Sequence, residues 1–230
     1  MRINIKRMGA EIEAHGQGAG KEKAAHILNR KANAKLDYVT SVFTEIPGDI
    51  CRVKYDGFLH KKLEFSGLYR LQELSMAYEL QNRFFAIIYD LNYDLDVPVS
   101  ATDDGDYSFG ISYDGIMKRK EVRFAAKGRT GELEDAYLRN LNIPLILDRI
   151  KALDLLDFII IRDAAANCFK VRCKSMVGSA TWNLIPPVFY VIKPKRQECV
   201  MLIELFELII DALQNPEYEA VSCKTLIQEQ

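Results

Sequence analysis

Carboxylates and a lysine around one predicted hairpin are the residues of this sequence best suited to metal-assisted chemistry. Asp106 and Asp114 flank the first strand, Glu121 lies on the second strand, and Lys127 follows it. Converging carboxylates can bind Mg²⁺ and orient a water molecule for attack. The triplet that starts at Glu121 has Arg123 in place of lysine, and an arginine stays protonated and cannot act as a base.

The order of predicted elements resembles the αβββαβ core of the PD-(D/E)xK nuclease fold in topology. The order is a helix over 21–36, strands, a hairpin over 107–126, a helix, and a strand over 157–162, with extra elements between 50 and 91. This resemblance implies a divalent-metal-dependent nuclease with a degenerate core and Mg²⁺ as its cofactor. It implies as catalytic residues Glu22, Asp114, Glu121 and Lys127, and as metal ligands Asp106, Asp114 and Glu121.

Basic residues gather in two segments that could form one binding surface. Residues 1–36 hold eight Lys or Arg and three acidic residues, and a second basic group lies on the hairpin strand over 117–126. Phe109, Tyr113 and Phe124 lie nearby, and interleaved aromatic and basic residues suit nucleic-acid contact. The predicted nucleic-acid-binding residues are Lys21, Lys23, Arg30, Lys31, Lys118, Arg119, Lys120 and Arg123.

An acidic segment offers a competing explanation for the basic strand. Residues 84–117 contain seven Asp and neither Lys nor Arg. The acidic segment and the basic strand would meet across one hairpin, where each opposite-charge pair stabilises by roughly 0.2–1 kcal/mol. Such pairs would account for the charge pattern without any ligand.

The amino-acid composition excludes two classes of protein. The 230 residues carry a net charge of −1 and are 49% apolar, which excludes a globally basic nucleic-acid coat and a fully disordered chain. No secretory signal and no uncharged run of 18 apolar residues occurs, so we expect no membrane partner. Five cysteines without a C-x-x-C pair indicate reduced thiols, and therefore a cytoplasmic protein.

Hydrophobic periodicity predicts an α+β fold with a mixed, largely antiparallel sheet and flanking helices. Besides the elements above, we expect strands over 38–46, 50–55, 84–91, 168–175 (ended by Gly178) and 184–192, the last at a sheet edge because of its two prolines. We expect further helices over 66–82, 132–156 with a bend at Pro144, and 198–213. The predicted domains are a basic loop and helix over 1–36, a single α+β domain over 37–214, and a C-terminal tail over 215–230.

Two functional hypotheses follow from these patterns. The first is a cytosolic interaction or regulatory protein that needs no cofactor. Its contact surface for a protein or a nucleic acid is the charge-segregated hairpin together with the basic N-terminal helix. The second is the Mg²⁺-dependent nuclease. A small-molecule enzyme with an unrecognised site is a third alternative, and the sequence makes no prediction of oligomeric state.

Overall fold

Nine strands and four helices make up the part of the chain that the structure, a computed structural model, describes: residues 19–48, 50–67, 69–99, 107–114, 121–127, 131–184 and 186–215, without the side chains of 19–26, Asp114 and Leu184. The helices are α2 (Ala19–Thr44), α3 (Glu132–Leu141), α4 (Pro144–Ala152) and α5 (Arg196–Gln214). The strands are β1 (Cys51–Gly57), β2 (His60–Phe65), β3 (Glu73–Arg83), β4 (Ala86–Pro98), β5 (Ser108–Asp114), β6 (Glu121–Ala126), β7 (Leu155–Asp163), β8 (Cys168–Leu184) and β9 (Pro187–Val191). The predicted α+β class is confirmed.

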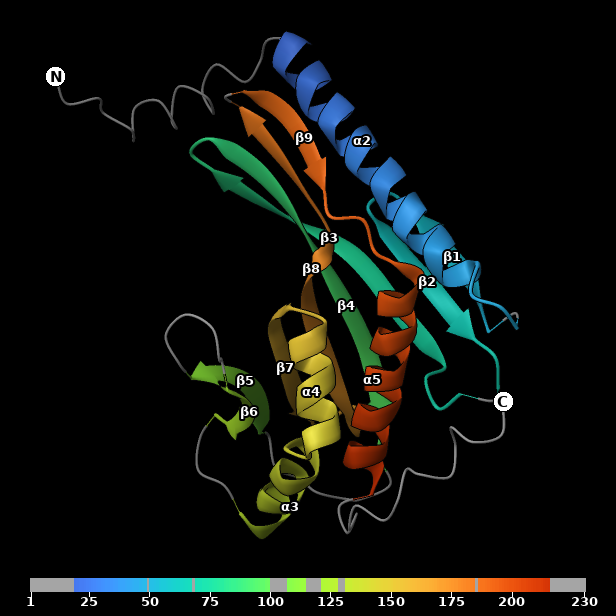
Figure 1. The fold of residues 1–230 in the computed structure, drawn as a ribbon, viewed down its shortest axis with the longest axis vertical. Helices are drawn as coiled ribbons and strands as arrows, with labels where there is room; N and C mark the ends of the chain where they lie inside the picture. The colour runs from blue at the N-terminus through green and yellow to red at the C-terminus, as the bar shows by residue number, and fades with distance from the viewer. Residues whose placement is uncertain are drawn as a thin grey trace, which may run out of the picture.

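The strands form one sheet in the order β1-β2-β3-β4-β8-β7-β5-β6, and all of these described pairings are antiparallel. Strand β8 pairs with β4 along one side, and along its other side it pairs with β7 first and then with β9. The helices cover one face of this sheet (Figure 1). The hairpin ends of β3–β4 and β8–β9 project together at the end of the sheet where α2 begins (Figure 1).

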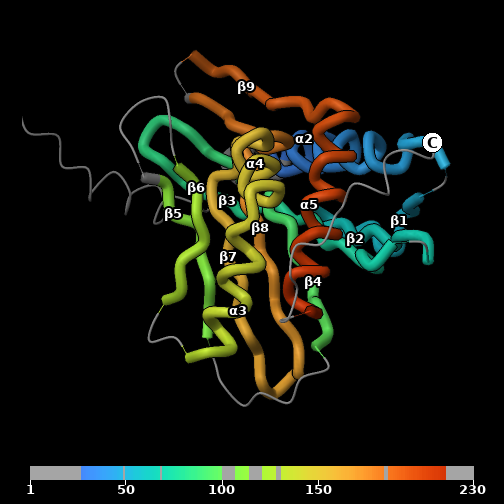
Figure 2. The backbone as a smooth tube through the Cα atoms, turned by 60° about the horizontal axis from the view of Figure 1, so that its bottom comes forward, coloured from blue at the N-terminus to red at the C-terminus, as the bar shows by residue number. Residues whose placement is uncertain are grey.

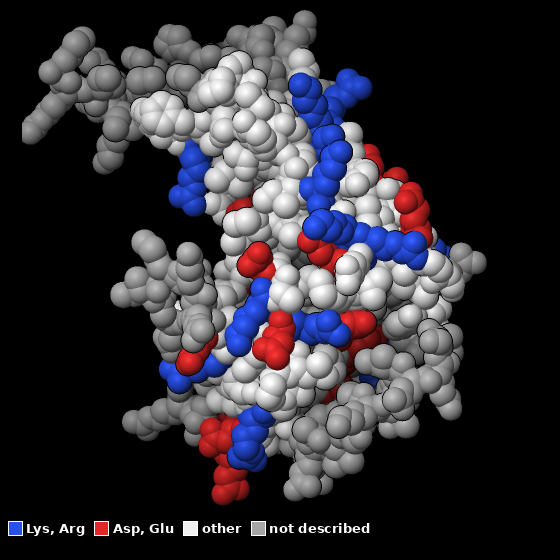
Figure 3. All heavy atoms as spheres, in the orientation of Figure 1, with Lys and Arg blue, Asp and Glu red and all other residues white. Residues whose placement is uncertain are grey.

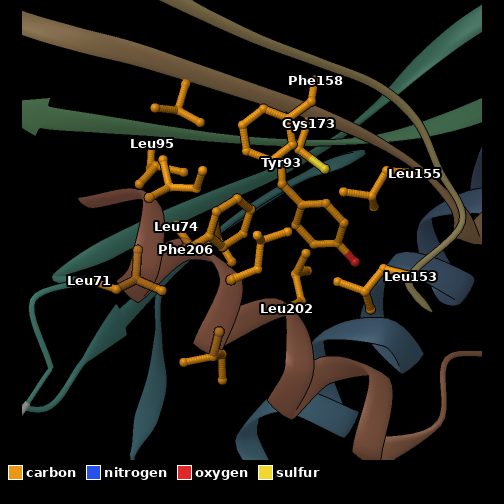
Figure 4. Packing of buried hydrophobic residues seen from close by; sticks show 14 of the residues in the cluster. Leu71, Leu74, Tyr93, Leu95, Leu153, Leu155, Phe158, Cys173, Leu202 and Phe206 are labelled. Atoms are coloured by element: carbon orange, nitrogen blue, oxygen red, sulfur yellow. The ribbon is translucent and has the colours of Figure 1, made fainter. Parts of the chain in front are cut away.

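The core lies between the sheet and the helices, and α5 supplies much of it. Phe206 is fully buried, with its ring centroid 6.3 Å from that of Tyr93 on β4 and 6.5 Å from that of Phe158 on β7. Figure 4 shows Tyr93 among these side chains and Leu202. Full burial of an apolar side chain of this size contributes roughly 1.5–3 kcal/mol. Helix α5 therefore packs directly on the central strands of the sheet and stabilises the contact between the two layers.

The predicted strand over 38–46 is wrong, because these residues continue helix α2 to Thr44. Val39, Val42, Phe43 and Ile46 are all buried, at the i, i+3, i+4, i+7 spacing of one helix face. Packing of that face against the sheet outweighs the β propensity of its valines and aromatic residues. The domain boundary expected after residue 36 therefore falls within one helix.

The predicted helix over 66–82 is also wrong, because β3 begins at Glu73. Leu74, Met76 and Tyr78 are buried in strict alternation, which is the period of a strand with one covered face. The chain just before β3 joins the sheet at Gln72, whose carbonyl oxygen accepts a hydrogen bond from the Phe65 N–H at 2.8 Å.

Other predicted elements are confirmed. The helical stretch over 132–156 divides into α3 and α4, and Pro144 is the first residue of α4, where its missing N–H costs nothing. Strands β7 and β9 and helix α5 also lie close to where they were expected, whereas β4 begins at Ala86 and runs on to Pro98, beyond the strand predicted over 84–91. Gly178, however, does not end its strand, because β8 continues to Leu184.

Candidate functional site

The hairpin β5–β6 forms as predicted and places two of the predicted acidic residues opposite each other. Asp114 pairs with Glu121 in the strand register, and Ser112 pairs with Arg123. Glu121, Arg123 and Lys127 are exposed. The side chain of Lys127 passes over Gly110, where a Cβ atom would lie 3.2 Å from the Lys127 Cε atom.

The other predicted site residues are distributed away from this hairpin. Glu22, Lys21 and Lys23 lie in the first turns of α2, and Arg30 and Lys31 are exposed farther along it. Figures 1 and 2 both place α2 well apart from β5–β6, so the turn that carries Glu22 is not beside Glu121. The remaining predicted residues fall outside the described part of the chain: Asp106, Lys118, Arg119 and Lys120.

A metal site does not form from the side chains that the structure describes. Within these residues, no group of three or more His, Cys, Asp or Glu side chains could hold a metal ion. The predicted ligands Asp106 and Asp114 are not among the side chains tested, and the nuclease stays a prediction.

Two acidic residues of β4, Asp90 and Asp94, are paired with basic residues of β8. On the face of the sheet away from the helices, Arg172 Nε donates to Asp94 Oδ1 at 2.7 Å. Lys174 Nζ lies 3.0 Å from a carboxylate oxygen of Glu79 and 3.3 Å from one of Asp90. The hydrogen bond from Lys174 holds the pKa of Glu79 below its ordinary value. The centre of this open face is thus already paired within the molecule.

Unpaired basic residues instead lie on the helical side of the molecule. They come from the exposed side of α2 and from the segment that joins β9 to α5, and we call them the basic ridge: Arg30, Lys31, Lys35, Lys193, Lys195 and Arg196. None of the six forms an ion pair with any other residue that the structure describes. Figure 3 shows basic side chains in a row over α2 toward the start of α5.

The helical spacing of α2 explains how its part of the ridge is presented. Leu28, Ala32 and Leu36 are buried on one side of the helix, whereas Arg30 and Lys31 are exposed. Arg30 and Lys35 are about 8 Å apart along the helix axis, so their charges follow the helix over that length.

Contacts with α2 and with β8 fix the segment before α5. Lys193 Nζ lies over the ring of Tyr38, 5.8 Å from its centroid. Ile192 is tied to β8, because the Gly178 N–H donates to its carbonyl oxygen at 2.7 Å and its own N–H donates to the Ser179 carbonyl oxygen at 3.2 Å. These bonds fix the path of the chain immediately before the first basic residue of the segment.

Gly178 is required for that path. Its φ of +88° is a left-handed conformation that glycine adopts freely and other residues rarely do. A Cβ atom at this position would lie 2.5 Å from Leu91 Cδ2. The glycine that was expected to end a strand therefore bends it and directs the next segment toward α2.

The described ridge residues carry positive charges that lie close to one another along the chain of α2 and of the segment before α5. Lys31 and Lys35 are one turn apart on α2, and like charges at that spacing destabilise a helix by roughly 0.2–0.5 kcal/mol. A bound polyanion would relieve this repulsion. The sequence predicted Arg30 and Lys31 as binding residues, but it did not point to Lys35 or to the Lys-Pro-Lys-Arg run at 193–196, whose composition was the available signal.

The described cysteines are buried and free, namely Cys51, Cys168, Cys173 and Cys199. Burial raises the pKa of Cys51 to about 11 and that of Cys199 to about 12, so these two thiols stay protonated at neutral pH. None of the described helices combines the length and the apolar character needed to cross a membrane.

Comparison with known proteins gives one family. Residues 43–213 match the family described as "Protein of unknown function (DUF3156)". No curated protein and no solved structure matches the chain. The matched segment begins near the end of α2 and runs almost to the end of α5.

Proposed function

We propose that this chain, which belongs to the DUF3156 family, is a non-enzymatic interaction protein that binds nucleic acid through the basic ridge. The supporting observation is the convergence of Lys193 and the segment around it with α2, although they are more than 150 residues apart in the sequence. Six basic side chains gather there, and none of them is paired with an acidic residue in the described structure.

The shape of the ridge favours a nucleic-acid backbone over a compact anion. Its positive charges follow a helix and then the adjoining segment, and regularly spaced phosphates can contact such a row in succession. The exposed ring of Tyr38 lies within it and offers a surface on which a base could stack. The basic residues of β8, in contrast, are held by acidic residues of the same chain.

Fluorescence anisotropy with labelled single-stranded and duplex oligonucleotides tests this proposal. We expect the variant Lys31→Ala/Lys193→Ala/Arg196→Ala to bind more weakly than the natural chain at low salt. For duplex DNA, each lost phosphate contact should reduce the slope of log affinity against log salt by about 0.9. Arg123→Ala/Lys127→Ala, on the hairpin, is the matched control and should change binding little. Absence of binding, or equal loss in both variants, would contradict the ridge as the site.

The Mg²⁺-dependent nuclease is a second candidate because of the register of the β5–β6 hairpin. Asp114 and Glu121 are directly opposite each other, and like charges in such positions destabilise a strand pair unless a cation lies between them. Incubation of plasmid DNA with the protein and Mg²⁺ or Mn²⁺ tests this. Cleavage that is lost in Glu121→Ala would support the nuclease, and an intact plasmid would eliminate it.

A further inference from the structure

The projecting end of the sheet is almost free of charge. It consists of residues 80–89 at the β3–β4 turn and of residues 178–184 and 186–192 in and around the β8–β9 hairpin, which we call the distal blade. Arg83 is the only charged residue in these segments. Five apolar or aromatic side chains of the blade are 45–59% exposed: Leu80, Phe84, Phe85, Tyr190 and Ile192.

The turn of the β3–β4 hairpin has an unusual composition. Arg83 pairs with Ala86, so Phe84 and Phe85 are the two turn residues, and their rings meet edge to face with centroids 4.2 Å apart. Two-residue hairpin turns favour Asn-Gly or Asp-Gly, and apolar side chains gain nothing by pointing into water. Phe84 and Phe85 are therefore neither residues that this turn favours nor side chains that fill the core of a single molecule.

We propose that the distal blade is the surface through which two copies of this chain associate. A contact around a two-fold axis brings the same patch of each copy together, so a charged patch would oppose like charges. The blade avoids this penalty, whereas the centre of the open face is covered with charged side chains. Depletion of charge with enrichment in Phe, Tyr, Trp, Met and Arg is also the composition of interface cores.

Strand β9 gives this contact a backbone component. Among the described strands, β9 pairs with β8 alone, so its other edge has N–H and C=O groups available. Two copies of one edge strand can pair antiparallel around a two-fold axis, because that arrangement is self-complementary. This proposal does not depend on nucleic-acid binding, since the blade contains none of the ridge residues.

Sedimentation velocity of the full chain over a wide concentration range is the test. We expect a species with twice the 26.3 kDa mass of the chain. Phe84→Asn/Phe85→Gly installs the preferred turn residues and should yield a folded monomer, with circular dichroism as the check on folding. Tyr190→Lys places a positive charge in the blade of each copy and should also weaken association, without changing the β3–β4 turn.

Phe58→Ser is the matched control. Phe58 is as exposed as Phe85 and also lies at a two-residue hairpin turn, between β1 and β2. This variant should remain a dimer. A natural chain that is monomeric throughout, or dimers that persist in both blade variants, would overturn the proposal. So would a monomer that co-sediments with phosphatidylcholine–phosphatidylserine vesicles through Phe84 and Phe85, because the blade would then contact lipid.

Discussion

Lys193 and Tyr38 join two distant segments of the chain: the Lys193 ammonium lies 5.8 Å from the centroid of the Tyr38 ring. A cation over an aromatic face is attracted by the ring quadrupole, with about 0.5–1 kcal/mol gained at exposed sites. The contact holds the segment before α5 beside α2, and it leaves part of the Tyr38 ring facing solvent.

Removal of the Tyr38 ring should therefore weaken oligonucleotide binding. In Tyr38→Ala the segment with Lys193 loses its contact on α2, and a stacking surface is lost as well. We expect the affinity for single-stranded oligonucleotides in the anisotropy assay to fall several-fold. Tyr38→Phe keeps the ring and should bind like the natural chain, and equal affinities for all three proteins would contradict this role of Tyr38.

Gly178→Ala should destabilise the protein by more than about 1 kcal/mol. The substitution adds a Cβ atom 2.5 Å from Leu91 at a backbone φ of +88°, where non-glycine residues are strained. Urea denaturation measures the loss. Gly67→Ala is the control, because a Cβ atom there meets nothing within 4 Å, and it should change the free energy of unfolding little. Equal stabilities of the two variants would contradict the prediction.

Acid should destabilise the fold through the open face of the sheet. Hydrogen bonds from Lys174 and Lys170 lower the pKa of Glu79 and of Asp163 from their ordinary values of 4.5 and 3.8. The unfolded state therefore binds protons more readily than the folded state, so these pairs stabilise above the ordinary values and lose their effect as the pH falls through the lowered ones.

Thermal melts over the acidic range measure this effect. We expect the melting temperature to decline below about pH 4.5, and the decline to be smaller in Lys170→Met/Lys174→Met, which has lost these partners. The effect should also shrink in high salt, since one side chain of each pair is 56% exposed. A melting curve that does not change with acid would show that the pairs contribute nothing measurable.

The buried thiols should react only after unfolding. Burial raises the pKa values of Cys51, Cys168, Cys173 and Cys199, which suppresses the thiolate that attacks disulfide reagents. The variant Cys223→Ser leaves only these four. We expect this variant to react slowly with Ellman's reagent in buffer and rapidly in denaturant. A fast stoichiometric reaction in buffer would contradict the burial of these side chains.

Clear local rules made much of the fold predictable. Pro144 marked the division between α3 and α4 because it cannot donate a backbone hydrogen bond. The alternation of Phe169, Val171 and Cys173 with basic residues identified β8, and the structure buries these three side chains as expected. The hairpin predicted over 107–126 is present as the pairing of β5 with β6.

The two wrong elements are segments in which both periods fit the apolar residues. Tyr38–Ile46 is rich in β-formers, yet its buried residues keep the helical spacing. Leu71, Leu74 and Tyr78 suit a helix face, but Met76 completes an alternating strand pattern that the helical interpretation had to ignore. Packing against the sheet decides such cases, and that information is not local.

Only the part of the basic ridge on α2 could be predicted from the sequence, again because the rest depends on tertiary contacts. The positive charge of α2 is visible within one segment, whereas its neighbours at 193–196 come from the far end of the sequence. Their meeting depends on the bend at Gly178 and on the pairing of Ile192 with β8. These are tertiary relationships, and hairpin signals alone pointed to the strand over 117–126 instead.

Most of helix α2 lies outside residues 43–213, the segment that matches the family, and this affects the design of a fragment for expression. Most of α2 precedes residue 43, yet Ala32, Leu36 and Val39 are fully buried and Asn29 accepts a hydrogen bond from the Tyr89 hydroxyl at 2.8 Å. A fragment that begins at residue 43 would lack most of α2 and would expose apolar side chains of the sheet to solvent. We therefore expect it to aggregate when it is expressed. The packed structure thus includes more of the chain than the segment that matches the family.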